Sequence, residues 1–163
     1  MKKLIITIIC VFILGLAYLL LFTGSDSRFY MNQGAGMEPT LVNNQEVSGF
    51  TVEASLLNRG DIIVFTAPSS LPSNSANRLI KRVIGLPGDT VSISNGSISV
   101  LTESGETYNP NLSPTPAGQT ITKKVEPNSL FVIGDNTSNS LDSRFFGLVS
   151  FDDVQSRITL TEN

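Results

Sequence analysis

The hydrophobic pattern of the chain begins with one long apolar run. Residues 4–22 carry no charged side chain and consist mainly of Ile, Leu, Val and Phe. A helix of about 20 such residues spans the roughly 30 Å hydrocarbon core of a bilayer, so the run predicts a transmembrane anchor. Lys2 and Lys3 precede it, and positive charge favours the cytoplasmic side. We therefore expect a cytoplasmic N-terminus at 1–3, a single-pass anchor at 4–22 and an extracytoplasmic remainder.

A cleavable secretory signal peptide is the alternative interpretation of this run. Thr23 and Ser25 would then be small residues around a cleavage site after Ser25. The run is longer than the apolar core of a usual signal peptide, which favours an anchor retained in the cell membrane. Under both interpretations the C-terminal part is exported. We expect a polar linker over 23–30 and one domain over 31–163.

Short apolar segments separated by turn residues follow the anchor and predict a mostly β domain. Asn95-Gly96, with clean alternation on both sides, is a strong hairpin signal within 91–100. No amphipathic helix of useful length is apparent, and 53–58 is expected to form only a helical turn. The other expected strands are 45–52, 62–65, 79–84, 129–133, 146–149 and 157–160, with loops at 66–76 and 103–119.

Composition excludes several kinds of site. Cys10, the only cysteine, lies in the apolar run, so we expect no disulfide and no cysteine metal site. The chain has no histidine, which removes the Ser-His-Asp triad, the Cys-His pair and nearly all zinc chemistry. We expect neither a metal nor a cofactor. The net charge of −3 and the lack of a basic cluster argue against a nucleic-acid partner.

Lys81 lies inside the apolar segment from Leu79 to Ile84. Burial there would disfavour the charged form of the lysine and lower its pKa toward the range of a general base. A solvated lysine on a strand is the commoner case. The local pattern alone leaves both interpretations open.

Three motifs lie in the exported part: Gly36-Met-Glu-Pro-Thr-Leu41, Lys81-Arg-Val-Ile-Gly-Leu-Pro-Gly-Asp89, and Gly134-Asp-Asn followed by Ser140-Leu-Asp-Ser-Arg-Phe-Phe-Gly147. Their order and spacing resemble those of type I signal peptidases. The anchor, and Arg59-Gly-Asp61 before a buried strand, extend the resemblance over essentially the whole chain. That family consists of membrane-anchored serine endopeptidases that remove signal peptides from exported proteins. They use a serine–lysine dyad on a mostly β fold shared with self-cleaving repressor proteins.

The resemblance implies a role for each matching residue. Lys81 takes the place of the general base, Ser140 contributes a hydroxyl near it, and Asp142 and Arg144 form a supporting ion pair. Read without the motif, Asp142 and Arg144 would be an ordinary surface pair worth under about 1 kcal/mol. The residues expected to form the structural turn of the site are Gly134, Asp135 and Asn136.

Substrate contacts are also implied by the resemblance. Met37, Pro39 and Ile80 are expected to bind the substrate, and the residue at position 37 faces the substrate or the membrane in the family. Alternatively, Met37 and Leu41 are core residues of the first strand.

One position departs from the family pattern. The nucleophilic serine of the family immediately precedes Met37, where this chain has Gly36. Glycine can neither attack a carbonyl nor donate a proton to Lys81. Losing the nucleophile of a serine protease lowers turnover about a millionfold, equivalent to roughly 8 kcal/mol. Gly34 occupies the position of a side-chain oxyanion donor in some relatives, so backbone N–H groups around Gly34 and Gly36 would have to form the oxyanion hole.

Two hypotheses follow from this departure. The first is a catalytically inactive homologue that serves as a peptide-binding, chaperone-like accessory in export or pilus assembly. Proteins of this kind, encoded with surface pili, are known in Gram-positive bacteria, and this chain resembles them in its short length and lack of a second anchor. The expected partners are membrane lipid and an exported protein or signal peptide, with a pilin or a sortase as the candidates.

The second hypothesis is an active signal peptidase. It would require that residue 36 is an engineered replacement for serine, or that another group works with Lys81. The candidates for such a group are Thr40, Ser25, Ser27 and a water activated by Glu38.

Overall fold

The structure is a computed structural model, and it describes residues 12, 15, 27–71 and 77–160. The N-terminus expected at 1–3, the cleavage site considered after Ser25 and, apart from residues 12 and 15, the anchor expected at 4–22 lie outside the described residues. Within the part that is described, no helix is both long and apolar enough to cross a membrane.

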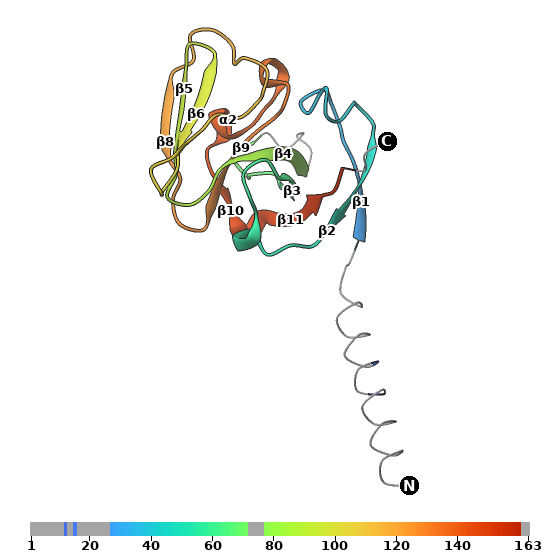
Figure 1. The fold of residues 1–163 in the computed structure, drawn as a ribbon. Helices are drawn as coiled ribbons and strands as arrows, with labels where there is room; N and C mark the ends of the chain where they lie inside the picture. Colours follow the sequence, from blue (N-terminus) through green and yellow to red (C-terminus); the bar gives the residue numbers. More distant parts are fainter. Residues whose placement is uncertain (1–11, 13–14, 16–26, 72–76, 161–163) are drawn as a thin grey trace, which may run out of the picture.

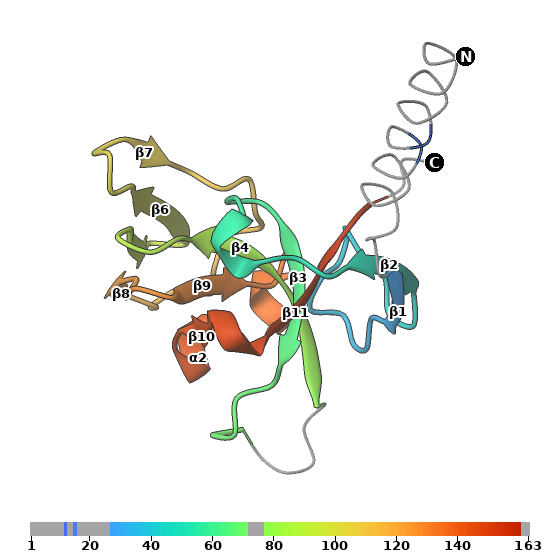
Figure 2. The ribbon, with the colours of Figure 1, turned by 90° about the horizontal axis from the view of Figure 1, so that it is seen from below.

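The described strands form two antiparallel sheets (Figure 1). The larger has the order β1-β2-β11-β3-β4-β9-β10 and the smaller β7-β6-β5-β8. The strands of the larger sheet are β1 Ser27–Met31, β2 Glu46–Phe50, β3 Ile62–Thr66, β4 Arg78–Gly85, β9 Ser129–Ile133, β10 Val149–Ser150 and β11 Val154–Ile158. Those of the smaller sheet are β5 Thr90–Ser94, β6 Ser97–Leu101, β7 Thr107–Tyr108 and β8 Ile121–Lys124. The smaller sheet and the β1–β2 pair lie at opposite ends of the molecule (Figures 1 and 2).

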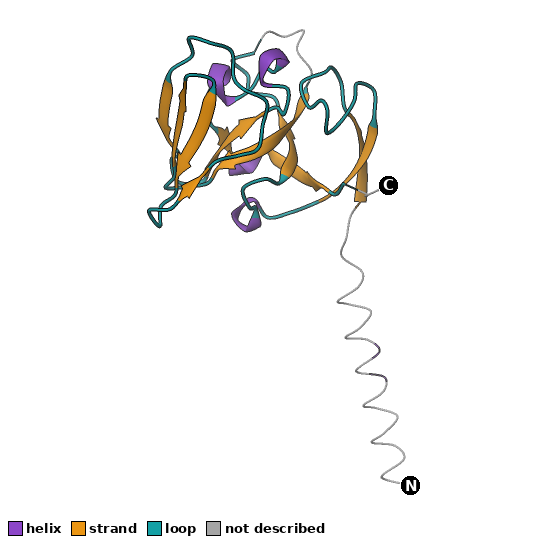
Figure 3. Cartoon of the chain, turned by 45° about the horizontal axis from the view of Figure 1, so that its top comes forward, coloured by secondary structure: helices purple, strands orange, loops and turns teal. Residues whose placement is uncertain are grey.

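The mostly β prediction is confirmed. The helical segments between the described strands are short (Figure 3). Their bounds are η1 Ala54–Leu56, η2 Thr137–Asn139, α2 Ser143–Phe146 and η3 Phe151–Asp153. The β5–β6 hairpin turns at Asn95 and Gly96, both with positive φ (51° and 80°), as a tight two-residue hairpin turn requires.

Three expected segments differ from the structure. The polar linker expected over 23–30 gives way to β1 from Ser27 on, because backbone pairing with β2 holds a strand in which only Tyr30 is buried. The strand expected at 146–149 is replaced by α2 and β10. Asp142 caps α2 by accepting a hydrogen bond from the backbone N–H of Arg144. The last strand, β11, begins at Val154 instead of 157.

The core is divided among three groups of buried side chains. One fills the space between the two sheets, and another packs beneath β10 and α2. The third lies beneath the loop that joins β1 to β2 and contains Met37, Leu41 and Ile80. This third group supports the loop that carries residue 36.

Candidate active site

Residue 36 lies in the loop between β1 and β2. The side-chain amide of Asn32 donates hydrogen bonds to the carbonyls of Leu41 (3.1 Å) and Val42 (2.9 Å), which closes the loop on itself. Gly36 does not have a left-handed φ, so its backbone would accept a side chain. A Cβ at this position would lie 3.4 Å from Lys81 Nζ. The fold therefore directs any side chain at position 36 toward the amine of Lys81.

Lys81 is buried, with 7% of its surface exposed. Its amine donates a hydrogen bond to the carbonyl of Ile80 at 3.0 Å. Desolvation by this burial lowers the pKa of Lys81, and the negative charges of Asp142 and Asp135 partly oppose that shift. Of the two interpretations that the sequence left open, the desolvated amine is the one observed. A lowered pKa favours the neutral amine, which is the form that can take up a proton from a neighbouring group.

The turn at Gly134–Asn136 clamps the loop that carries Gly36. The backbone N–H of Asn136 donates to the Gly36 carbonyl (3.1 Å), and its side-chain amide donates to the Ala35 carbonyl (3.1 Å). A Cβ at Gly134 would collide with the Gly36 carbonyl oxygen and with Ser140 Oγ. Only glycine fits at position 134, so the predicted structural turn has a steric cause.

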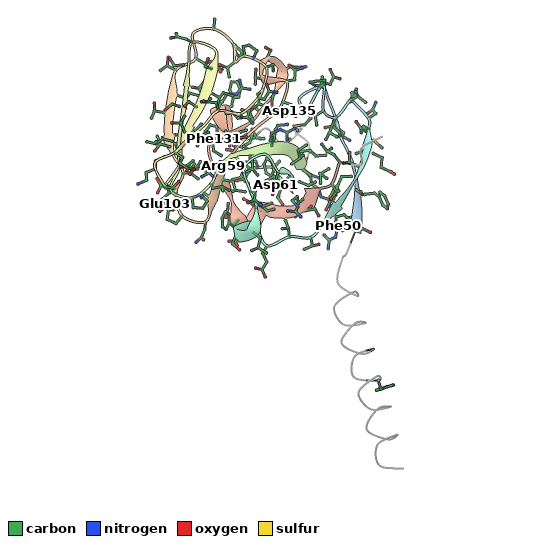
Figure 4. All side chains as sticks on the ribbon, viewed as in Figure 1. Phe50, Arg59, Asp61, Glu103, Phe131 and Asp135 are labelled. Carbon is green, nitrogen blue, oxygen red and sulfur yellow. The ribbon has the colours of Figure 1, made fainter. Side chains whose placement is uncertain are left out.

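Asp135 forms a hydrogen-bonded network with Arg82, a residue for which the sequence predicts no role in the site. Arg82 Nε donates to Asp135 Oδ1 at 2.7 Å, Arg82 Nη2 contacts Asp135 Oδ2, and Arg82 Nη1 donates to the Gly60 carbonyl at 2.7 Å. The hydrogen bonds with Asp135 raise the pKa of Arg82. The hydroxyl of Thr40 also donates to Asp135. Neighbouring side chains in a strand point to opposite faces of the sheet. This alternation is a signal in the sequence from which the different positions of Arg82 and Lys81 could have been predicted. Figure 4 shows Asp135 at the upper side of the molecule, where the β1–β2 loop lies.

Asp142 and Arg144 form a buried ion pair. Arg144 donates from Nε to Oδ1 at 2.8 Å and from Nη2 to Oδ2 at 2.9 Å, and both side chains are fully buried. Asp142 also accepts from the Gly134 N–H (3.1 Å), while Arg144 donates to the Thr137 carbonyl (2.7 Å). The surface-pair alternative is therefore wrong. The pair fixes the segment that follows the Gly134 turn.

Ser140 lies in the site, but its hydroxyl forms no hydrogen bond with the amine of Lys81. Its Cα would lie 3.7 Å from a Cβ at Gly36, but its Oγ is buried and has no hydrogen-bond partner among the described residues. The expected hydroxyl near Lys81 is thus present in the site, packed against Gly134.

Met37 and Gly34 have surroundings in the structure that differ from those expected from the sequence. Met37 is fully buried, because a turn closed by the Leu41 N–H and the Met37 carbonyl (2.9 Å) directs both side chains into the core. This burial agrees with the core interpretation of Met37, although within a loop instead of a strand, and its expected contact with substrate stays a prediction. Pro39 is exposed beside this turn.

Gly34 is the second case. Its backbone N–H donates to the side-chain oxygen of Asn43 at 2.7 Å. This N–H is therefore already engaged and does not face the site as an oxyanion donor. The φ of +84° at Gly34 gives the reason for glycine at this position.

A groove of about 430 Å³ runs between β1 and β4. It is lined by Phe29, Tyr30, Met31, Gln33, Val64, Asn77, Arg78 and Ile80. Ile80 lines this groove, and its expected contact with substrate stays a prediction.

Both strands present an open edge to this groove. Within the described residues, β1 pairs with β2 alone, and the segment 78–81 of β4 pairs with β3 alone, since pairing with β9 begins at Arg82. The backbone N–H and C=O of Val83 form hydrogen bonds on the side of β3. Along a strand, the backbone groups of successive residues point alternately to one side and to the other. The backbone groups of Arg78 and Ile80 therefore point to the open edge.

Comparison with known proteins identifies relatives. The family described as signal peptidase, peptidase S26, matches residues 1–161. A probable signal peptidase I-2 from Synechocystis is 36% identical over 119 residues, covering 71% of this chain and 53% of that protein. A signal peptidase I P from Bacillus subtilis subsp. natto is 33% identical over 139 residues, covering 77% of this chain and 71% of that protein.

A crystal structure of a signal peptidase I from Enterococcus faecalis aligns with 63% of this chain and 97% of its own, at 30% identity and a TM-score of 0.49. The chain spans about half the length of the Synechocystis protein. The match over nearly the whole sequence shows that this chain belongs to the signal peptidase family, peptidase S26.

Proposed function

We propose that this chain is a membrane-anchored signal peptidase homologue that binds peptides of exported proteins without cleaving them. The observation that carries the proposal is the glycine at position 36, opposite the amine of Lys81. The Gly134 turn contacts the Gly36 carbonyl through Asn136, and the buried ion pair of Asp142 and Arg144 fixes the segment that follows this turn. A site that keeps these supports but lacks the attacking hydroxyl is suited to binding without hydrolysis.

The other hydroxyl groups near the site are poorly placed to replace a serine at position 36. The hydroxyl of Thr40 donates a hydrogen bond to Asp135 and accepts one from Arg82, so it is engaged in their network. Ser140 Oγ is buried against Gly134. A nucleophile must lie within hydrogen-bond reach of its base and be exposed to the carbonyl that it attacks.

The groove between β1 and β4 supports peptide binding. An extended peptide can pair with an exposed strand edge through its backbone, while pockets accept alternate side chains. Two edges face this groove, and Phe29 (70% exposed) and Met31 (50% exposed) on β1 offer apolar surface. We therefore assign the groove to an extended segment of an exported protein or its signal peptide.

The biological setting follows from the resemblance to pilus-associated homologues. In this proposal an apolar N-terminal helix holds the protein in the membrane with its N-terminus in the cytoplasm. The β domain then meets its partner, a pilin or a sortase, on the outer side, and assists export or pilus assembly.

An active signal peptidase is the second candidate, and one observation favours it. The backbone at Gly36 accepts an L-amino acid, and a side chain there would lie next to Lys81 Nζ. A serine at this position in a natural counterpart would complete the dyad.

A cleavage assay separates the two candidates. The full chain in mild detergent, its Gly36→Ser variant and the double variant Gly36→Ser, Lys81→Ala are each incubated with one purified secretory precursor. We expect no cleavage by the unaltered chain, cleavage by Gly36→Ser and none by the double variant. Cleavage by the unaltered chain that is lost in a Lys81→Ala variant would show that the protein is an enzyme.

A further inference from the structure

Part of the long loop expected over 103–119 connects the smaller sheet to the candidate site. This part, residues 113–115, lies between β7 and β8, and we call it the bridging segment. The backbone N–H of Thr115 donates to the carbonyl of Gly96 at 2.9 Å, which fixes one end of the segment to the turn of the β5–β6 hairpin. The other end of the segment forms hydrogen bonds with the turn that follows Gly134.

Two hydroxyl groups make these hydrogen bonds. The hydroxyl of Ser113 donates to the carbonyl of Asp135 at 2.7 Å and accepts from the backbone N–H of Thr137 at 3.2 Å. In return, the hydroxyl of Thr137, a residue that is 2% exposed, donates to the carbonyl of Pro114 at 2.5 Å. A hydroxyl can donate one bond and accept others, so a single serine side chain holds both ends of segment 135–137.

Each residue of segment 135–137 supports a different part of the site. The side chain of the first residue pairs with Arg82. The backbone N–H of the second, Asn136, donates to the carbonyl of Gly36 at 3.1 Å. The carbonyl of the third accepts a hydrogen bond from Arg144 at 2.7 Å. A displacement of this short segment would therefore move three supports of the site together.

The same segment leads to the amine of Lys81. Thr137 is the first residue of η2, and Asn139 is its last. A Cβ at Gly36 would lie 3.3 Å from the carbonyl of Asn139 and 3.4 Å from Lys81 Nζ, so the end of η2 and the amine border one small space. The hydrogen bonds with Ser113 thus fix the start of the helical turn whose end lies beside this space.

We propose that Ser113 is a positioning residue of the candidate site, whose hydroxyl holds segment 135–137 in place and, through η2, keeps water away from the amine of Lys81. A serine beside the smaller sheet thereby determines the geometry of a site that is built mainly on the larger sheet. This inference goes beyond the proposed function, because it concerns the arrangement of the site and holds whether the site cleaves peptides or only binds them.

The test measures the titration of Lys81 in the full chain in mild detergent. The NMR chemical shift of its ε-carbon is followed against pH in isotopically labelled protein, and a Lys81→Met variant assigns the signal. Desolvation is the largest cause of the lowered pKa of Lys81, and the charges of Asp142 and Asp135, each paired with an arginine, oppose it. A Ser113→Ala variant removes no charge. We expect it to admit water to the amine and to raise the midpoint of Lys81 by about one pH unit.

Three further variants identify the group responsible. Thr137→Val removes the opposing hydroxyl at nearly constant volume and should raise the midpoint as well. Ser113→Thr keeps a hydroxyl and should leave the midpoint of the unaltered chain unchanged. Thr102→Val is the matched control, because the buried hydroxyl of Thr102 accepts a hydrogen bond from the Glu106 N–H at 2.9 Å within the turn between β6 and β7. It should leave the midpoint unchanged.

This control separates positioning from a general structural role. A loss of stability alone does not alter the titration of a lysine in the protein that remains folded. The inference is overturned if the midpoint of Ser113→Ala equals that of the unaltered chain, or if Thr102→Val raises the midpoint as far. Ser113 is exposed, so alanine leaves no cavity there, and Thr137→Val decides the question if that variant does not fold. Since neither peptide nor cleavage enters the measurement, both results leave the proposed function as it stands.

Discussion

At the scale of single residues, two glycines of the site have different reasons to be glycine. Gly134 is required by packing, since a Cβ would collide with the carbonyl of Gly36 and with Ser140 Oγ. Gly36 has no such requirement. A Cβ there would need only a small shift of the Asn139 carbonyl, now 3.3 Å away. The loss of the nucleophile is therefore not imposed by the fold.

The buried amine of Lys81 makes stability depend on pH. Burial lowers its pKa in the folded chain, whereas the unfolded chain has a lysine of ordinary pKa, about 10.4. Between these two values the unfolded state binds more protons, so the free energy of unfolding increases with pH. We expect the unaltered chain to gain stability relative to a Lys81→Met variant as pH rises through this window, by at most about 1.4 kcal/mol per pH unit.

Urea unfolding of both proteins at several values between pH 7 and 10 measures this difference. The groups that the two chains share titrate in both and cancel in the comparison. A difference that stays constant over the whole range would mean that Lys81 has the same pKa folded and unfolded, contrary to its burial.

At the scale of elements, the buried side-chain amide of Asn32 helps to close the β1–β2 loop. Asn32 is 3% exposed and satisfies the carbonyls of Leu41 and Val42. An Asn32→Ala variant takes this donor away from the buried carbonyl of Leu41, and we expect it to lose about 1–3 kcal/mol of stability. Asn43→Ala is the matched control, because Asn43 is exposed and accepts a single bond from Gly34. Denaturant unfolding compares the two, and equal losses would contradict the assigned role of Asn32.

The elements predicted correctly are those whose signals are local. Alternation around Asn95-Gly96 and the apolar run of β3 identify their structures without reference to other segments. β1 was missed because its pattern is mostly exposed and depends on pairing with β2. The motif identified Lys81. The network of Arg82 with Asp135 has no local signal, because it joins residues 53 positions apart.

At the scale of the whole molecule, the site belongs to the larger sheet, while a separate ion pair connects the two sheets. Arg59, in the turn before β3, donates to Asp89, at the turn between β4 and β5, from Nε at 2.8 Å and from Nη2 at 2.5 Å. Asp89 is fully buried and also accepts from the Leu86 N–H at 2.8 Å. This carboxylate therefore depends on an arginine from another part of the fold.

Removing that arginine should destabilise the whole domain. In an Arg59→Met variant Asp89 would stay buried without its partner, and breaking a buried pair in this way costs about 3–5 kcal/mol. Arg157→Met is the matched control, because Arg157 is 45% exposed and lies 3.7 Å from Asp61, so its loss should cost under about 1 kcal/mol. Thermal and urea unfolding of both variants measure the difference. A small domain has only about 5–15 kcal/mol of stability in total, so the first variant should unfold at a clearly lower urea concentration than the second. Similar midpoints for the two would show that Asp89 does not need Arg59, and that packing between the sheets holds the smaller sheet in place by itself.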